Sequence, residues 1–158
     1  MSIHHVKGSI LKDETMQYIG IPVNCIAYPH NSLLERVKCD YPKAYESYLA
    51  WRDESGCPHN RSCLDIGNIK VVPVDSYNIV LMATQYYYGK FAEGDRAISY
   101  DGIWDCLNKI AQTAPIGSKI GLPGYLGCGE DGGNWHVIYI MICDVLEQDY
   151  EVYIFYED

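Results

Sequence analysis

The chain has 158 residues, of which 48% are hydrophobic and 21% are charged, and its formal net charge is −9. This length and composition predict one folded domain, residues 1–158, with a sizeable core, and they exclude an intrinsically disordered chain. The negative charge and the scattered lysines and arginines argue against nonspecific nucleic-acid binding, which depends on the neutralisation of phosphates.

No apolar run approaches the ~20 residues that cross a bilayer, so no membrane partner is expected. The first fourteen residues lack the apolar core and cleavage site of a signal peptide. The seven cysteines are an odd number and do not predict a disulfide framework. Cys25, Cys106 and Cys143 lie in apolar patterns and are expected to be small core residues. We therefore predict a cytoplasmic protein.

The first third of the chain predicts two strands and two helical segments. His4–Leu11 is expected to be a strand that runs into a turn at Gly8–Ser9, and Tyr18–Asn24 is expected to be a second strand. A polar residue at the carboxyl end of a strand, such as Asn24, is a candidate ligand contact in an α/β protein. Leu33–Val37 predicts a helical turn. Pro42 is expected to begin a second helix. Apolar and aromatic residues in and just before it recur at three- and four-residue spacing, which favours core packing: Tyr41, Ala44, Tyr45, Tyr48 and Trp51.

The polar segment that follows, residues 52–65, contains a cluster of potential metal ligands. Cys57, His59 and Cys63 lie close together, and Cys39 is available as a fourth ligand. The spacing matches no common zinc-finger or zinc-ribbon pattern. We therefore expect a surface loop with incidental thiols and no bound metal.

The middle of the chain predicts a hairpin, a loop and a helix. Gly67–Val74 and Ser76–Ala83 are rich in valine and isoleucine and are expected to pair as a hairpin. Thr84–Asp95 is expected to be a long loop, and its aromatic residues either stack on a ligand or close the core. Ala97–Ala114 predicts an amphipathic helix with Ser99 as its N-cap.

The segment Ser118–Trp135 has the most distinctive pattern. A short apolar strand, Ile120–Pro123, leads into five glycines within ten residues: Gly124, Gly127, Gly129, Gly132 and Gly133. A helix, Trp135–Leu146, follows directly. A glycine loop between a strand and a helix N-terminus directs backbone N–H groups towards an anion, and glycine lets the main chain approach it closely. We predict binding of a diphosphate or a phosphorylated sugar, with a tight turn as the alternative.

The last two elements complete the predicted fold. Trp135–Leu146 is apolar on nearly all sides and is expected to be deeply covered, and Glu151–Tyr156 is expected to be the last strand. Helices that alternate with apolar strands predict an α/β fold, a three-layer α/β/α sandwich with a mixed central sheet. The first strands and the hairpin are expected to contribute antiparallel pairs.

Four segments, in this order, carry a family resemblance. Val23–Cys25 is similar to a V-N-x strand end, and Tyr41–Tyr48 is similar to a Y-P-x-x-Y helix. Ala83–Gln85 with Tyr88–Gly89 and Ser99–Tyr100 is similar to a strand, loop and helix start. Leu122–Trp135 is similar to a P-x-x-G-C-G-x-x-G-G-x-W signature. With these motifs the chain resembles a macro domain, the ADP-ribose-binding module, in the branch of ADP-ribose 1″-phosphate phosphatases and ADP-ribosyl-glutamate hydrolases.

The resemblance implies a small-molecule partner, ADP-ribose or a derivative that includes protein-linked ADP-ribose, and no cofactor. It implies that Asn24 contacts the distal ribose, that the Gly127–Gly129 loop binds the diphosphate, and that Tyr153 or Phe155 lies near the adenine. The full set of candidate ligand-binding residues is Ser9, Ile10, Asn24, Gln85, Gly127, Cys128, Gly129, Glu130, Tyr153 and Phe155.

Three positions depart from the family pattern. The usual G-D turn, whose aspartate binds the adenine amino group, is Gly8–Ser9 here, so looser adenine selectivity is expected. The glycine-rich first loop is replaced by Pro29–Ser32, which is expected to reshape the distal-ribose side. The lysine of the glutamate hydrolases is replaced by Gln85, so a covalent lysine mechanism is not expected.

Two side chains are candidate catalytic residues. Asp131, beside Glu130, and His30 are each placed to act as a general base on a water that attacks the distal ribose or its phosphate. The alternatives are a helix N-terminal aspartate favoured by the dipole and an exposed loop histidine. The sequence therefore leaves two functions open: a hydrolase of the distal-ribose substituent, and a binding module without turnover. A zinc enzyme built on Cys57, His59 and Cys63 ranks last.

Overall fold

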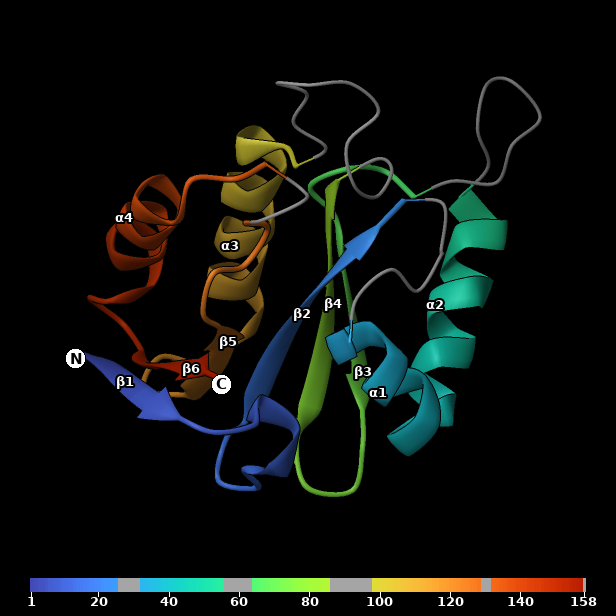
Figure 1. Ribbon diagram of the computed structural model, residues 1–158, viewed down its shortest axis with the longest axis horizontal. Coiled ribbons are helices and arrows are strands. Elements are labelled where there is room, and N and C mark those ends of the chain that lie inside the picture. Colours follow the sequence, from blue (N-terminus) through green and yellow to red (C-terminus); the bar gives the residue numbers. More distant parts are fainter. Residues whose placement is uncertain (26–31, 56–63, 86–97, 129–131, 158) are drawn as a thin grey trace.

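The computed structural model describes residues 1–25, 32–55, 64–85, 98–128 and 132–157. Six strands and five helices lie in this part of the chain, and Figure 1 shows their arrangement. In chain order they are β1 (Ile3–Lys7), the 3₁₀ helix η1 (Ile10–Lys12), β2 (Tyr18–Asn24), α1 (Ser32–Asp40), α2 (Pro42–Ser55), β3 (Ile69–Pro73), β4 (Asn78–Gln85), α3 (Tyr100–Thr113), β5 (Lys119–Pro123), α4 (Trp135–Leu146) and β6 (Glu151–Tyr156).

The strands form one mixed sheet in the order β1-β6-β5-β2-β4-β3. The predicted hairpin is confirmed, because β3 pairs with β4 in antiparallel fashion. The expected antiparallel pairing of the first strands is wrong: β1 runs parallel to β6, and β2 runs parallel to β4 and β5. The reason is topological, since β6 and β5 lie between β1 and β2 and keep these two consecutive strands apart.

Helices cover both faces of the sheet, as the predicted three-layer sandwich requires. Figure 1 shows α1 and α2 on one side of β2 and β4, and α3 and α4 on the other. Each face has its own apolar cluster, so the central strands are buried on both sides and consist of continuous apolar runs. The aromatic stripe of α2 packs in the core as predicted, with Ala44, Tyr48 and Trp51 buried.

The expectation that α4 is deeply covered is wrong. Ile138, Ile142 and Leu146 are buried, but Val137 and Ile140 are 38% and 52% exposed. Because α4 lies in an outer layer, packing on the sheet and α3 covers one of its faces and leaves the other in solvent. Trp104 on α3 is likewise exposed, at 38%.

Several predicted boundaries also change. The first strand ends at Lys7, because Gly8 adopts a φ of +136° and Ile10–Lys12 forms the 3₁₀ helix. Thr84 and Gln85, expected in a loop, are buried residues of β4 that continue its pairing region. Cys25 and Cys106 are buried as expected, whereas Cys143 is partly exposed. Within the described residues, no helix has the length and apolar character needed to span a membrane.

The two faces of α4 give a direct test of its packing. Ile142→Ala, which empties a buried site, is expected to lower the free energy of unfolding by about 2–5 kcal/mol. Ile140→Ala removes the same atoms from a half-exposed side chain and is expected to cost within about 0.5 kcal/mol. Urea denaturation measures both values, and equal losses would contradict the orientation of α4.

Candidate functional site

The carboxyl ends of five parallel strands meet at one edge of the sheet. In open α/β sheets, ligands bind at this edge. Four of these strands are followed at this edge by Gly8 (after β1), Glu157 (after β6), Gly124 (after β5) and Cys25 (after β2). The fifth strand, β4, ends there at Gln85. Figure 1 shows the carboxyl end of β4 near the first turn of α3, and Gln85 at this end forms an isolated bridge with Ile98. This edge is therefore the candidate site.

A β-bulge shapes the centre of the edge. Val23 pairs with Ala83 and Asn24 pairs with Gln85, which leaves Thr84 as an extra residue in β4. The Thr84 carbonyl accepts a hydrogen bond from Ser99 N (2.8 Å), and its buried Oγ1 has no hydrogen-bond partner among the described residues. Bulges beside binding sites re-aim backbone and side-chain groups, and this one directs the Thr84 carbonyl to Ser99, the N-cap of α3.

Asn24 is fully buried at the end of β2, and a tyrosine holds it in place. Tyr48 Oη donates to the Asn24 carbonyl and lies 3.2 Å from Asn24 Oδ1. Desolvation strongly raises the pKa of Tyr48, so the hydroxyl remains a proton donor. This contact fixes the amide orientation. Gln85, the neighbour across the β2–β4 pair, is also buried.

The glycine loop after β5 depends on close backbone approach. Gly127 has a φ of +71°, and its carbonyl accepts a hydrogen bond from Gly133 N (2.9 Å). A Cβ at position 127 would overlap Cδ1 of Ile98, and a Cβ at Gly133 would overlap the Gly127 carbonyl. The loop also places Tyr125 at a φ of +58°, a conformation unusual for a residue with a side chain. Glycine is therefore required at position 127 by its positive φ and by its contact with Ile98, and at position 133 by contact alone.

Two helix N-termini lie together beside the loop. Ser99 Oγ caps α3 by accepting from Gly102 N (3.0 Å), and Asn134 Oδ1 caps α4 by accepting from His136 N (2.9 Å). Asn134 N also donates to Tyr100 Oη (2.9 Å), which links the two starts. The positive ends of both helix dipoles thus point to the same region, an arrangement that favours an anion.

The structure distinguishes the two aromatic candidates of β6. Phe155 and Ser9 line a cavity of about 380 Å³ at the carboxyl end of β1, and Gly8 also lines it. The ring of Tyr153 instead stacks on His4, with centroids 4.5 Å apart. Ile10 is buried in the core beside Ser9. Phe155 is therefore the better candidate for the base end of a ligand.

Several predicted residues lie outside the described residues. They are His30, Gly129, Glu130 and Asp131, the Cys57, His59 and Cys63 cluster, and the aromatic residues of 86–91. Their roles remain predictions. Among the described residues, no group of three or more His, Cys, Asp or Glu side chains is arranged to hold a metal ion, and Cys39 is exposed.

Sequence reasoning missed one contact at this edge. Arg36 of α1 donates to Ser9 Oγ (3.0 Å) and to both carboxylate oxygens of Glu157 (2.9 and 2.7 Å). No local signal could have revealed it, because Arg36 is 27 residues from Ser9 and 121 from Glu157.

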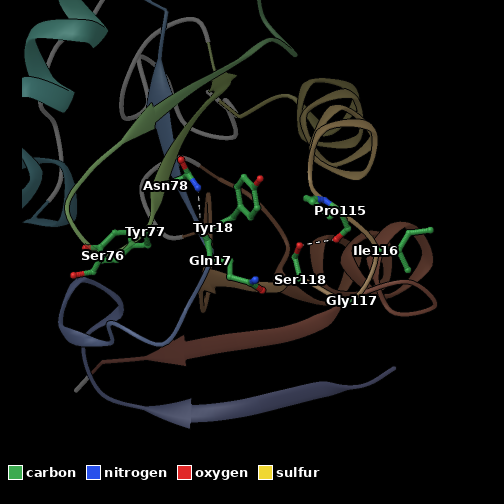
Figure 2. Close-up of a pocket in the computed structure, with 9 residues that line it drawn as sticks. All are labelled: Gln17, Tyr18, Ser76, Tyr77, Asn78, Pro115, Ile116, Gly117 and Ser118. Atoms are coloured by element: carbon green, nitrogen blue, oxygen red, sulfur yellow. Dashed lines mark hydrogen bonds between the residues drawn. The ribbon is translucent and has the colours of Figure 1, made fainter.

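A second cavity, of about 410 Å³, lies at the opposite edge of the sheet. Figure 2 shows its lining at the amino ends of β2, β4 and β5, where Asn78 Nδ2 donates to the Gln17 carbonyl (3.2 Å) and Ser118 Oγ donates to the Pro115 carbonyl (2.6 Å). Its lining contains no charged side chain. These hydrogen bonds stabilise the connections, and we assign this cavity no ligand.

Gly127→Ala tests the close approach of the Gly127 backbone to the Ile98 side chain. Strain at positive φ together with overlap of Ile98 is expected to cost at least ~3 kcal/mol. The matched control is Gly117→Ala, which has a φ of +91° but more space and is expected to cost about 1 kcal/mol. An Ile98→Ala background should relieve part of the first loss, measured as a coupling energy in urea denaturation. Equal costs at both glycines would refute the contact.

The fold resembles those of several solved structures, although no sequence-based comparison finds a match. No protein-family model matches the sequence, and no curated protein matches it. A protein of unknown function from Bacteroides thetaiotaomicron has a TM-score of 0.81 at 20% identity, and the match covers 99% of this chain and 98% of that one. The macrodomain of Thermus aquaticus DarG has a TM-score of 0.74 at 18% identity, and 97% of each chain is covered.

A third similar structure is Thermosipho africanus DarTG, which was solved in complex with ADP-ribose. Its TM-score is 0.77 at 20% identity, and 98% of this chain matches 41% of the DarTG chain. These similarities agree with the mixed sheet and two helical layers described above. The chain has the macrodomain fold.

Proposed function

We propose that this chain binds ADP-ribose or a derivative of it at the carboxyl edge of the sheet. The observation that carries the proposal is the glycine loop, Gly124–Cys128, beside the capped N-termini of α3 and α4. Backbone N–H groups and helix dipoles at such a place bind a diphosphate without side-chain cations. This mode of binding suits a protein whose net charge is −9.

The spacing of the candidate contacts also suits a long ligand. Ser9 follows β1, the glycine loop follows β5, and Asn24 ends β2, so the base end, diphosphate end and distal-ribose end follow the strand order. Three strand spacings separate β1 from β2, which is about 14 Å. A ligand with two sugars joined by a diphosphate would reach all three regions. The ADP-ribose complex of the structurally similar DarTG supports the same ligand class.

We further propose that the bound derivative is hydrolysed at its distal-ribose substituent. The supporting observation is the acidic pair Glu130–Asp131, which follows the Gly127–Gly129 loop directly in sequence. In this proposal Asp131 or His30 takes a proton from a water that attacks the substituent, which is a phosphate, an acyl ester or a protein linkage. Gln85, whose amide is not a nucleophile, takes no covalent part. Binding without turnover is the alternative function.

Calorimetry with ADP-ribose tests the binding proposal. Asn24→Ala is expected to weaken affinity by roughly tenfold, because it removes the amide assigned to the distal ribose. Tyr48→Phe, which keeps that amide but removes the hydroxyl that orients it, should have a smaller effect. The matched control is Asn78→Ala at the opposite end of β4, which should bind normally. Wild-type protein that binds no ADP-ribose would refute the proposal.

Phosphate release from ADP-ribose 1″-phosphate tests turnover. We expect Asp131→Ala to lower the rate by roughly 10²-fold or more while ADP-ribose affinity changes little, because a general base contributes about 10²–10⁴-fold. His30→Ala is measured beside it to decide which residue acts. If the wild type binds ADP-ribose but releases no product from the phosphate or acyl derivatives, the chain is a binding module.

A further inference from the structure

An arginine–carboxylate pair joins the ends of two neighbouring parallel strands. Ser9 lies just beyond β1 and Glu157 just beyond β6, and Gly8 N donates to the Tyr156 carbonyl (2.9 Å) between them. The guanidinium of Arg36 donates hydrogen bonds to both carboxylate oxygens of Glu157 and to Ser9 Oγ. Two strand ends and α1 are thus connected through one side chain.

This group lines a cavity of about 330 Å³. The side chains of Arg36 and Glu157 are 35% and 37% exposed, so the pair forms a wall of the cavity instead of being buried behind it. The cavity shares Gly8 and Ser9 with the neighbouring cavity that Phe155 lines. Its complete lining is Lys7, Gly8, Ser9, Lys12, Arg36 and Glu157.

The chemistry of the pair matches the edge of an adenine base. Each carboxylate oxygen has two acceptor positions. Arg36 uses one on each, and the Ser9 hydroxyl also hydrogen-bonds to the carboxylate, so one position of Glu157 can still accept from an exocyclic amino group. The Arg36 fork holds the pKa of Glu157 below its usual range, which keeps the acceptor ionised at neutral pH. A base with a carbonyl in place of the amine would instead place oxygen against oxygen.

We propose that Glu157, positioned by Arg36, reads the exocyclic amino group of the adenine in the bound nucleotide. This rests on the proposed binding of ADP-ribose. The resemblance gives this contact to an aspartate at the position of Ser9, and the loss of that aspartate predicted looser selectivity. With Glu157, the carboxylate comes from the segment after β6 instead of the segment after β1, and selectivity for adenine is retained. Ser9 contributes by holding Arg36 in place.

Calorimetry with two nucleotides tests the inference: ADP-ribose and its hypoxanthine analogue, which carries a carbonyl at the place of the amine. We expect wild-type protein to prefer ADP-ribose by roughly tenfold or more, since a hydrogen bond to a charged group is lost with the analogue. Glu157→Gln, whose amide accepts or donates, should bring the ratio to within about twofold while ADP-ribose still binds. Arg36→Lys, which lacks the fork, should lower the ratio part of the way.

The matched control is Asp53→Asn at the Arg52–Asp53 pair on α2, which should leave the ratio unchanged. A ratio that survives Glu157→Gln, or that collapses in Ser9→Ala but not in Glu157→Gln, would overturn the role of Glu157 while ADP-ribose binding stands. Wild-type protein that binds neither nucleotide would overturn the proposed function as well, so the two failures are distinguishable.

Discussion

The structure depends on the contact between the Gly127 carbonyl and Gly133, with Ile98 packed against the same loop. This contact is made where β5 ends, where α3 is about to begin and where α4 is about to begin. A side chain at either glycine would separate the loop from its neighbours and move the two helix starts apart. Backbone packing therefore positions the N-termini of α3 and α4, and the proposed anion site depends on that packing.

At the same edge, the Thr84 carbonyl and Asn24 are buried and hydrogen-bonded, whereas Thr84 Oγ1 has no partner among the described residues. The bulge at Thr84 lets β4 remain paired with β2 while its carbonyl reaches Ser99. Tyr48 reaches from α2 on the opposite face to hold Asn24. The two helical layers are thus connected to the strand ends from both sides, so the candidate site is supported by elements that also build the core.

The sequence predicted the strongly bounded elements best. Tyr18–Asn24, Trp135–Leu146 and Glu151–Tyr156 match the observed β2, α4 and β6, because each is an apolar run between clear polar or glycine boundaries. Thr84 and Gln85 are polar, so the sequence predicts a loop at these positions, whereas both residues are buried in β4. The sequence overestimates the burial of α4. An apolar pattern shows which side chains tolerate burial, whereas the number of neighbouring layers determines which side chains are buried.

The candidate site was predictable in part for the same reason. Asn24 and the glycine loop lie at ends of strands, so their meeting at one edge follows from parallel pairing. The contact of Arg36 with Ser9 and Glu157 joins three distant segments and has no signature in any of them. Serine at position 9 predicts looser adenine selectivity from the sequence alone, whereas our proposal assigns adenine recognition to its spatial neighbour Glu157.

The strand order has one more consequence, for association between chains. The two outer strands, β1 and β3, are each five residues long. Lysines project from both of them, Lys7 and Lys70, and β3 ends in Pro73, which has no N–H to offer a neighbour. Short, charged and proline-terminated edges resist the addition of a further strand. A sheet whose central strands are among the most apolar parts of the chain is thereby protected at both margins from edge-to-edge aggregation.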